Sequence, residues 1–254
     1  MHDLEAVAAR RAAPVHLLAS TASTNDDAKA GARAGSPHGS LWIADTQTAG
    51  RGRQGRRWES PPGENLLFSL LLRIPCAPAR VPPLSLVVGL AVRDAVARAL
   101  GETGDDTVKV KWPNDVHVRG RKIAGILVES AVAGTRVESL IVGIGINVKT
   151  RELPPELASI ATSVALEGGA ADRAAILLDV LAGLDRDLER AAHTGLGALR
   201  ARLEAHDALV GKRISSDGLA GIASGIDADG RLLLRGDDGT VHRVASGEVH
   251  LSVG

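Results

Sequence analysis

Cysteine, aromatic residues and long apolar runs are scarce in this sequence of 254 residues. Its single cysteine, Cys76, excludes a disulfide framework within the chain and a metal site built on a CxxC pair. No apolar run reaches the roughly 18 residues that a membrane-spanning helix needs. The first residues also lack the apolar core of a signal peptide. These absences predict a cytoplasmic protein without a membrane partner.

An excess of charge of one sign is also missing. Basic and acidic residues number 30 each, so the chain has no net positive field of the kind that nucleic-acid-binding domains usually carry. Lysine is rare within the basic set: there are 24 arginines and six lysines, and Lys109, Lys111 and Lys122 fall within fourteen residues. In a chain that otherwise uses arginine, such a cluster hints at a need for compact ammonium groups.

The segment 45–65 (DTQTAGRGRQGRRWESPPGEN) shows neither helical nor strand periodicity. Glycines that can take positive φ alternate there with arginines, whose planar forks match carboxylate and phosphate oxygens. The strand-like runs 40–44 and 66–73 would hold such a loop in place. We interpret it as a clamp for a small ligand with more than one negative charge, although a solvated surface loop or a nucleic-acid patch would have a similar composition. The interleaved residues are Gly50, Gly52, Gly55, Arg51, Arg53, Arg56 and Arg57, and Trp58 follows them.

Elsewhere the sequence predicts strands and helices around one large core. Strands are expected at 15–19, 108–112, 116–118, 122–130 and 137–148, and helices within 20–35 and at 82–100, 173–191 and 198–208, with a polar loop at 101–106. From Gly211 onward, five short strand-like runs separated by Gly/Asp turns predict a small β-barrel. We therefore place the two domains at 1–208 and 209–254.

Two further patterns each allow two explanations. Ser23, Thr24 and Asn25 can cap the helix that follows them, or can present polar groups to a ligand. Gly143 and Gly145 lie on one face of a buried strand, where glycine marks either the close approach of a ligand or tight packing beneath a neighbouring helix.

Taken together, the motifs resemble the biotin–protein ligase family, in the form that lacks an N-terminal DNA-binding domain. Five motifs occur in the family's order over nearly the whole chain, and the SGEV-type C-terminal region matches as well. The motifs are STN (23–25), QTAGRGR (47–53) with its continuation through Trp58 to Asn65, KWPND (111–115), GRKIAGILVE (120–129) and GIGIN (143–147).

The resemblance implies an α+β fold: a mixed β-sheet flanked by helices, as in class II aminoacyl-tRNA synthetases, followed by an SH3-like barrel. It also implies two half-reactions. Biotin and ATP, with Mg²⁺ on the phosphates, give biotinyl-5′-AMP and pyrophosphate. A lysine of a biotin carboxyl carrier protein then takes the biotin and releases AMP. Because a carboxylate must approach a triphosphate, positive charge has to be arranged around both anions.

The family match assigns roles to individual residues. Lys122 would bridge the carboxylate and the α-phosphate, and Asp115 would hold the incoming lysine or accept its proton. The residues implied in catalysis are Lys122, Arg51, Arg53 and Asp115. Those implied in biotin binding are Ser23, Thr24, Asn25, Gln47, Gly50, Arg51 and Lys122. Those implied in nucleotide binding are Arg53, Arg56, Trp58, Asn114 and Asn147. The sequence predicts no metal ligands of the chain's own.

Because only about fourteen residues precede the first expected strand, we expect an enzyme without a repressor function and without a DNA partner. A homodimer is compatible with the sequence. Three other functions stay open: a lipoate–protein ligase, a non-catalytic biotin or nucleotide sensor, and nucleic-acid binding through the arginine loop. We also expect the segment 54–62 to be mobile without ligand and to become ordered when biotinyl-AMP binds.

Overall fold

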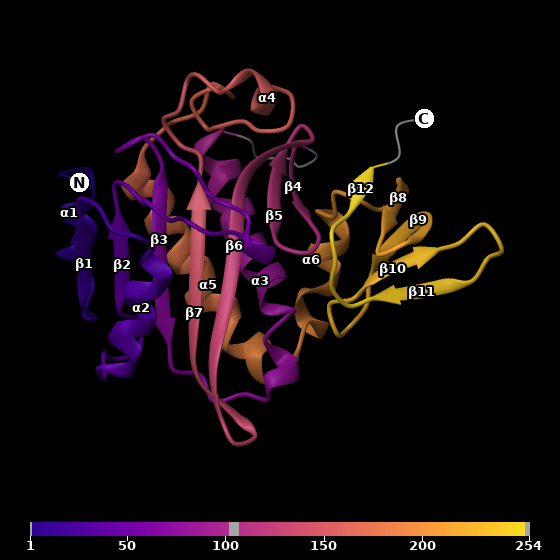
Figure 1. Ribbon diagram of the computed structural model, residues 1–254, viewed down its shortest axis with the longest axis horizontal. Coiled ribbons are helices and arrows are strands. Elements are labelled where there is room, and N and C mark those ends of the chain that lie inside the picture. The colour runs from indigo at the N-terminus through magenta and orange to yellow at the C-terminus, as the bar shows by residue number, and fades with distance from the viewer. Residues whose placement is uncertain (1, 102–106, 252–254) are drawn as a thin grey trace.

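The computed structural model describes residues 2–101 and 107–251 (Figure 1). Apart from Gly101, the predicted polar loop 101–106 lies outside the described residues. The larger part of the chain is built on a seven-stranded sheet in which β1 and β2 are parallel and all other neighbours are antiparallel. This confirms the predicted mixed sheet. In spatial order the strands are β1 (Val15–Leu18), β2 (Leu41–Ala44), β3 (Leu66–Leu72), β7 (Arg136–Ile146), β6 (Arg121–Ala133), β5 (Asp115–Val118) and β4 (Val108–Lys111).

Helices cover both faces of this sheet. In Figure 1, α3 (Leu84–Ala99) and α5 (Arg173–Thr194) lie behind it and α2 (Thr24–Arg33) lies in front. Every residue of β3 is buried, as expected for a central strand between two layers. The two rear helices pack closely: a Cβ added at Gly183 of α5 would lie 2.8 Å from Ala91 of α3. The helices on both faces hold the ends of the strands in place, and Lys111, Asp115 and Gly145 of the cleft described below lie at or near such ends.

Short helical elements connect these layers. Of these, α1 (His2–Ala8) and α4 (Pro155–Ala158) were not predicted, since each is too short to show a helical period. The helix predicted over 198–208 is a 3₁₀ turn, η3 (Gly197–Leu199), followed by α6 (Arg200–Ala205). Two other 3₁₀ turns are η1 (Arg53–Gly55) and η2 (Pro78–Arg80). None of the helices in the described ranges has the length and apolar character needed to cross a bilayer.

The C-terminal region forms the five predicted strands in a second, antiparallel sheet. Over residues 2–101 and 107–251, however, its edge strands β11 and β12 do not pair, so the sheet is not closed into a barrel by hydrogen bonds. This sheet packs onto the rest of the molecule, and Trp112 Nε1 donates to the Gly230 carbonyl at 2.9 Å. The strands, in spatial order, are β11 (Val241–Val244), β10 (Leu232–Arg235), β9 (Leu219–Ile226), β8 (Arg213–Ser216) and β12 (His250–Leu251).

Candidate active site

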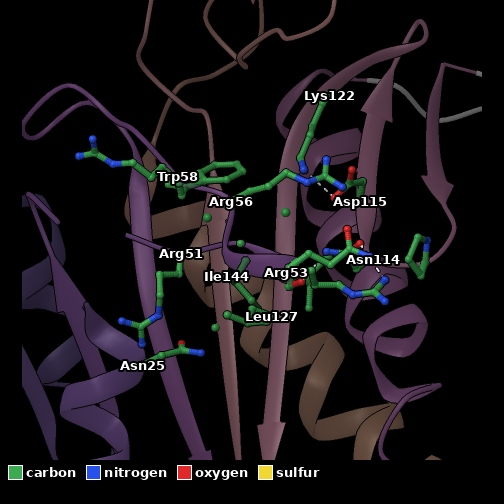
Figure 2. Close-up of a pocket in the computed structure, with 18 of the residues that line it drawn as sticks. Asn25, Arg51, Arg53, Arg56, Trp58, Asn114, Asp115, Lys122, Leu127 and Ile144 are labelled. Carbon is green, nitrogen blue, oxygen red and sulfur yellow. Dashed lines mark hydrogen bonds and ion pairs between the residues drawn. The ribbon is translucent and has the colours of Figure 1, made fainter. Parts of the chain in front are cut away.

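A cleft of about 170 Å³ opens between the sheet, the loop 45–65 and the C-terminal region (Figure 2). Its walls come from segments far apart in the sequence, which the order of the strands brings together. They are the start of α2, residues 47–58, residues 111–115, the first half of β6, the last residues of β7, and residues 247–249. Of the predicted site residues, those in the lining are Ser23, Thr24, Asn25, Gln47, Arg51, Arg53, Arg56, Trp58, Asn114, Asp115 and Lys122.

The end of the cleft next to α2 is a buried hydrogen-bond network. Gln47 Oε1 accepts from the backbone N–H of Thr24 at 2.8 Å and from its hydroxyl at 3.1 Å. Ser69 Oγ lies 2.7 Å from Thr24 Oγ1 and 2.5 Å from Asn25 Oδ1. Asn25 Nδ2 donates to Glu129 Oε2 at 2.7 Å. These groups are therefore held in fixed orientations before any ligand arrives.

Helix capping does not explain the polar residues at the start of α2. Ser23 occupies the N-cap position with an extended backbone, but its side chain makes no capping hydrogen bond. Only 3% of Ser23 is exposed, and it lines the cleft together with Thr24 and Asn25. This arrangement favours the alternative that these side chains present polar groups to a ligand.

Three strand glycines form the floor of the cleft. A Cβ added at Gly143 would lie 2.1 Å from Asn25 Oδ1, and one at Gly145 would lie 2.6 Å from the indole of Trp58. Gly125, the cross-strand partner of Gly145, would meet the same indole at 2.9 Å. Two side chains thus pack directly onto the backbone of β6 and β7, which only glycine permits here.

Positive charge gathers at the other end of the cleft. Lys122 Nζ lies 2.7 Å from Asp115 Oδ1 and 5.5 Å from the centre of the Trp58 ring, within reach of a cation–π interaction. Figure 2 shows Arg56 extending toward the same point. Arg53 NH1 donates to Asn114 Oδ1 at 3.5 Å. This end therefore gathers several cations around the carboxylate of Asp115.

Burial affects two of the cations at this end. Desolvation lowers the pKa of Arg53, although the nearby charge of Asp115 opposes that effect. Desolvation likewise lowers the pKa of Lys111, again against the influence of Asp115. Partly dry surroundings make the attraction between such cations and an anionic ligand stronger than it would be in water.

The structure does not bring every predicted residue to this point. Arg51 turns toward α2, where it forms a two-pronged ion pair with Asp26 at 2.8 and 2.5 Å and lowers the pKa of that carboxyl (Figure 2). Gly50 packs against the Trp58 carbonyl, and Asn147 Nδ2 donates to the Thr162 carbonyl at 3.0 Å. Gly50 and Asn147 thus lie beside the cleft and not in its lining.

Two charged residues that line the charged end, Lys111 and Glu248, were not among the predicted site residues. Lys111 belongs to the lysine cluster noted from the sequence, but no role was assigned to it there. Glu248 comes from the C-terminal region and lies 2.9 Å from Arg56. It stands inside the SGEV motif, so its position could have been suspected, but nothing in the sequence indicated its partner.

Two known protein-family models match segments of this chain. The biotin/lipoate A/B protein ligase family matches residues 17–147, and the biotin protein ligase C terminal domain matches residues 216–252. The chain belongs to the biotin/lipoate protein ligase family. Each predicted site residue lies within the first matched range.

Individual members of the family are similar over most of this chain. A biotin–[acetyl-CoA-carboxylase] ligase of Paracoccus denitrificans is 38% identical over 238 residues, covering 88% of this chain and 95% of that protein. The enzyme of the same name from Mycobacterium tuberculosis is 36% identical over 243 residues, covering 92% and 88%. A biotin protein ligase from Aquifex aeolicus, solved in complex with biotin and ATP, has a TM-score of 0.79 and 30% identity, with 95% of this chain and 99% of that chain covered.

This family membership and fold confirm the resemblance drawn from the motifs. They do not assign roles to single residues, so the catalytic, biotin and nucleotide contacts stay predictions. In the described part of the chain, no group of three or more His, Cys, Asp or Glu side chains is placed to hold a metal ion.

Proposed function

We propose that this member of the biotin/lipoate protein ligase family is a biotin protein ligase, which adenylates biotin with ATP and transfers it to a lysine of a biotin carboxyl carrier protein. The observation that carries the proposal is the division of one cleft into a buried polar end and a cationic end. The buried end suits the ureido ring of biotin, which both donates and accepts hydrogen bonds. The cationic end suits the triphosphate of ATP.

In the first half-reaction, a carboxylate oxygen of biotin attacks the α-phosphorus, a new O–P bond forms, and pyrophosphate leaves with the electrons of the broken P–O bond. Lys122 lies at the cationic end, 2.7 Å from Asp115. We assign it the charge that develops on the transferring phosphoryl group. Arg53 and Arg56 offer donors to the phosphates, which would also carry Mg²⁺.

The roles of Arg51 and Asn147 are less direct in this proposal. Arg51 reaches a carboxylate–phosphate junction only by leaving Asp26, so we assign it to the state with ligand bound. The amide of Asn147 already bonds the Thr162 carbonyl, so it would act by positioning that segment.

In the second half-reaction, the neutral amine of the acceptor lysine attacks the acyl carbon of biotinyl-AMP, and AMP leaves. Asp115 is 20% exposed at its side chain, so an incoming ammonium can reach it and give up a proton there. Closure of the loop 54–62 over the intermediate would keep water from the reactive anhydride. Because the reaction consumes ATP, we place the protein in the cytoplasm.

Exchange of labelled pyrophosphate into ATP, dependent on biotin and Mg²⁺, tests this function. We expect exchange in the wild type and a loss of about 10²- to 10³-fold in Lys122→Ala, the effect of removing one stabilising group from a transition state. Lys212→Ala, which removes an exposed lysine away from the cleft, is the matched control and should exchange like the wild type.

Two outcomes would contradict the proposal. Exchange with lipoate and none with biotin would assign the chain to the lipoate branch of the family. No exchange with either acid would leave a binding protein. The match of residues 216–252 to the biotin protein ligase C terminal domain favours biotin.

A further inference from the structure

The two ends of the loop 45–65 are joined to each other and to the segment that follows β7. The backbone N–H of Gly63 donates to the Asp45 carbonyl at 3.0 Å. Asn65 Oδ1 accepts from the Val148 N–H at 2.8 Å and from the Thr150 hydroxyl at 3.0 Å. We call this region, Asp45 together with residues 63–65, the neck of the loop. Every predicted ligand contact on the loop lies between its two sides.

One buried arginine bonds both sides of the neck. Arg173, the first residue of α5, is 2% exposed. Its NH1 group donates to Asp45 Oδ1 at 2.7 Å and to the Asn65 carbonyl at 3.3 Å. Its Nε and NH2 groups donate to the two oxygens of Asp3 in α1, at 2.8 and 2.6 Å. The guanidinium thus connects the neck to two helices that take no part in the cleft.

The contacts of Arg173 differ in kind from the ion pairs at the tip of the loop, where Arg51 and Arg56 lie. Burial makes an ion pair costly to break on one side, because the remaining charge is left unpaired in a dry place. Hydrogen bonding to Asp3 raises the pKa of Arg173, so the guanidinium stays charged. At the tip, by contrast, the pairs Arg51–Asp26 and Arg56–Glu248 are about 40–60% exposed and can exchange partners readily. The loop is therefore fixed at its neck and adaptable at its tip.

We propose that Arg173 is a positioning residue for the ligase reaction: by bonding Asp45 and Asn65 it sets where the loop places Gln47, Arg53 and Trp58. The inference rests on the proposed function. Arg173 does not line the cleft, so it acts on ligands only through the neck.

The two carboxylates on Arg173 provide a matched pair of variants. Asp45→Asn and Asp3→Asn each neutralise one partner of the same buried guanidinium with a side chain of the same shape, but only Asp45 belongs to the neck. For Asp45→Asn we expect KM for biotin and ATP to rise about tenfold, since small displacements of positioning groups are costly. In Asp3→Asn both KM values should stay within about twofold of the wild type. Its Tm, however, should fall at least as far as the Tm of Asp45→Asn does.

Limited trypsin digestion without ligand gives a second measurement that does not depend on activity. The loop offers cleavage sites at Arg51, Arg53, Arg56 and Arg57. Since cleavage follows the population of open conformers, we expect it to be about tenfold faster in Asp45→Asn and unchanged in Asp3→Asn. Digestion is carried out well below the Tm of both variants, so global unfolding does not contribute.

Equal effects of the two variants on KM and loop cleavage would overturn the proposal, since they would reduce Arg173 to a general stabiliser. An Asp45→Asn variant with unchanged KM and cleavage would overturn it as well. If wild-type protein shows no pyrophosphate exchange, the proposed function fails. The digestion would then still decide whether Arg173 positions the loop.

Discussion

The two ends of the cleft are built on opposite principles. At the α2 end, Thr24 and Asn25 are 3% and 5% exposed, and their polar groups are already hydrogen-bonded. At the charged end, Lys122 and Arg56 are 33% and 57% exposed at their side chains and are paired with carboxylates of the protein itself. The first end is preorganised, whereas in the proposed reaction the cations of the second would exchange protein carboxylates for ligand oxygens.

This difference fits the chemistry proposed for each end. A small ring with fixed donors and acceptors is best recognised by groups that cannot move, because unpaired buried polar atoms penalise the wrong ligand. A triphosphate that arrives, reacts and leaves as pyrophosphate needs cations that can release it. In the proposed reaction, Asp115 and Glu248 would hold those cations between turnovers through their ion pairs with Lys122 and Arg56.

The largest effect expected in this comparison contrasts the two ends directly. On adding biotinyl-AMP, hydrogen exchange in the segment 54–62 should slow by up to about 100-fold at a ligand concentration near 100 Kd. The first amides of α2 should change far less, because those of Asp26 and Asp27 already donate to the Ser23 carbonyl at 3.0 and 3.2 Å. Mass spectrometry of exchanged peptides measures both segments in one sample. Equal protection of the two segments from exchange, or unchanged exchange in the segment 54–62, would contradict the contrast between a preorganised and an exchangeable end.

Disturbing the preorganised end should have the next largest effect. In Gly143→Ala, the new Cβ would lie 2.1 Å from Asn25 Oδ1, so the amide must move and lose its bonds to Ser69 and Glu129. Overpacking of this kind costs about 1–3 kcal/mol, and we expect biotin affinity, measured by calorimetry, to fall about tenfold.

Gly197→Ala is the control for that experiment. No atom lies within 4 Å of a Cβ at Gly197, and its φ is not in the left-handed region, so its biotin affinity should equal that of the wild type. Unchanged binding in Gly143→Ala would show that the network at the α2 end rearranges freely and is not preorganised.

The sequence predicted the fold better than the pairings at the site. Alternating apolar runs and Gly/Asp turns were enough for the strands and main helices, because local burial patterns set them. The motif residues around Lys122 and Trp58 were also found, and both line the cleft.

The ion pairs and contacts at the site could not be predicted from the sequence, because they join segments that lie far apart along the chain. Arg173 reaches Asp45 across 128 positions, and Arg56 reaches Glu248, which lies between β11 and β12. Position 143 requires glycine because α2 packs Asn25 directly against it, a contact that the sequence does not reveal. Charge, spacing and turn chemistry predict which residues are available. The packing of the layers decides which of them meet.

The smallest predicted effect tests whether the ion pairs at the charged end compete with ligand. Glu248→Gln removes a carboxylate 2.9 Å from Arg56. An exposed pair of this kind contributes less than about 1 kcal/mol, so stability should hardly change. KM for ATP should fall about two- to threefold at low salt, because Arg56 no longer has a competing partner, and the gain should shrink as salt screens the charges. Asp237→Asn breaks another exposed pair of the C-terminal region, with Arg213, which does not line the cleft, and should leave KM for ATP unchanged. A rise of KM in Glu248→Gln would mean that Glu248 holds Arg56 in position for the phosphates, and the contrast between a fixed end and an exchangeable end would then apply only to Lys122 and Asp115.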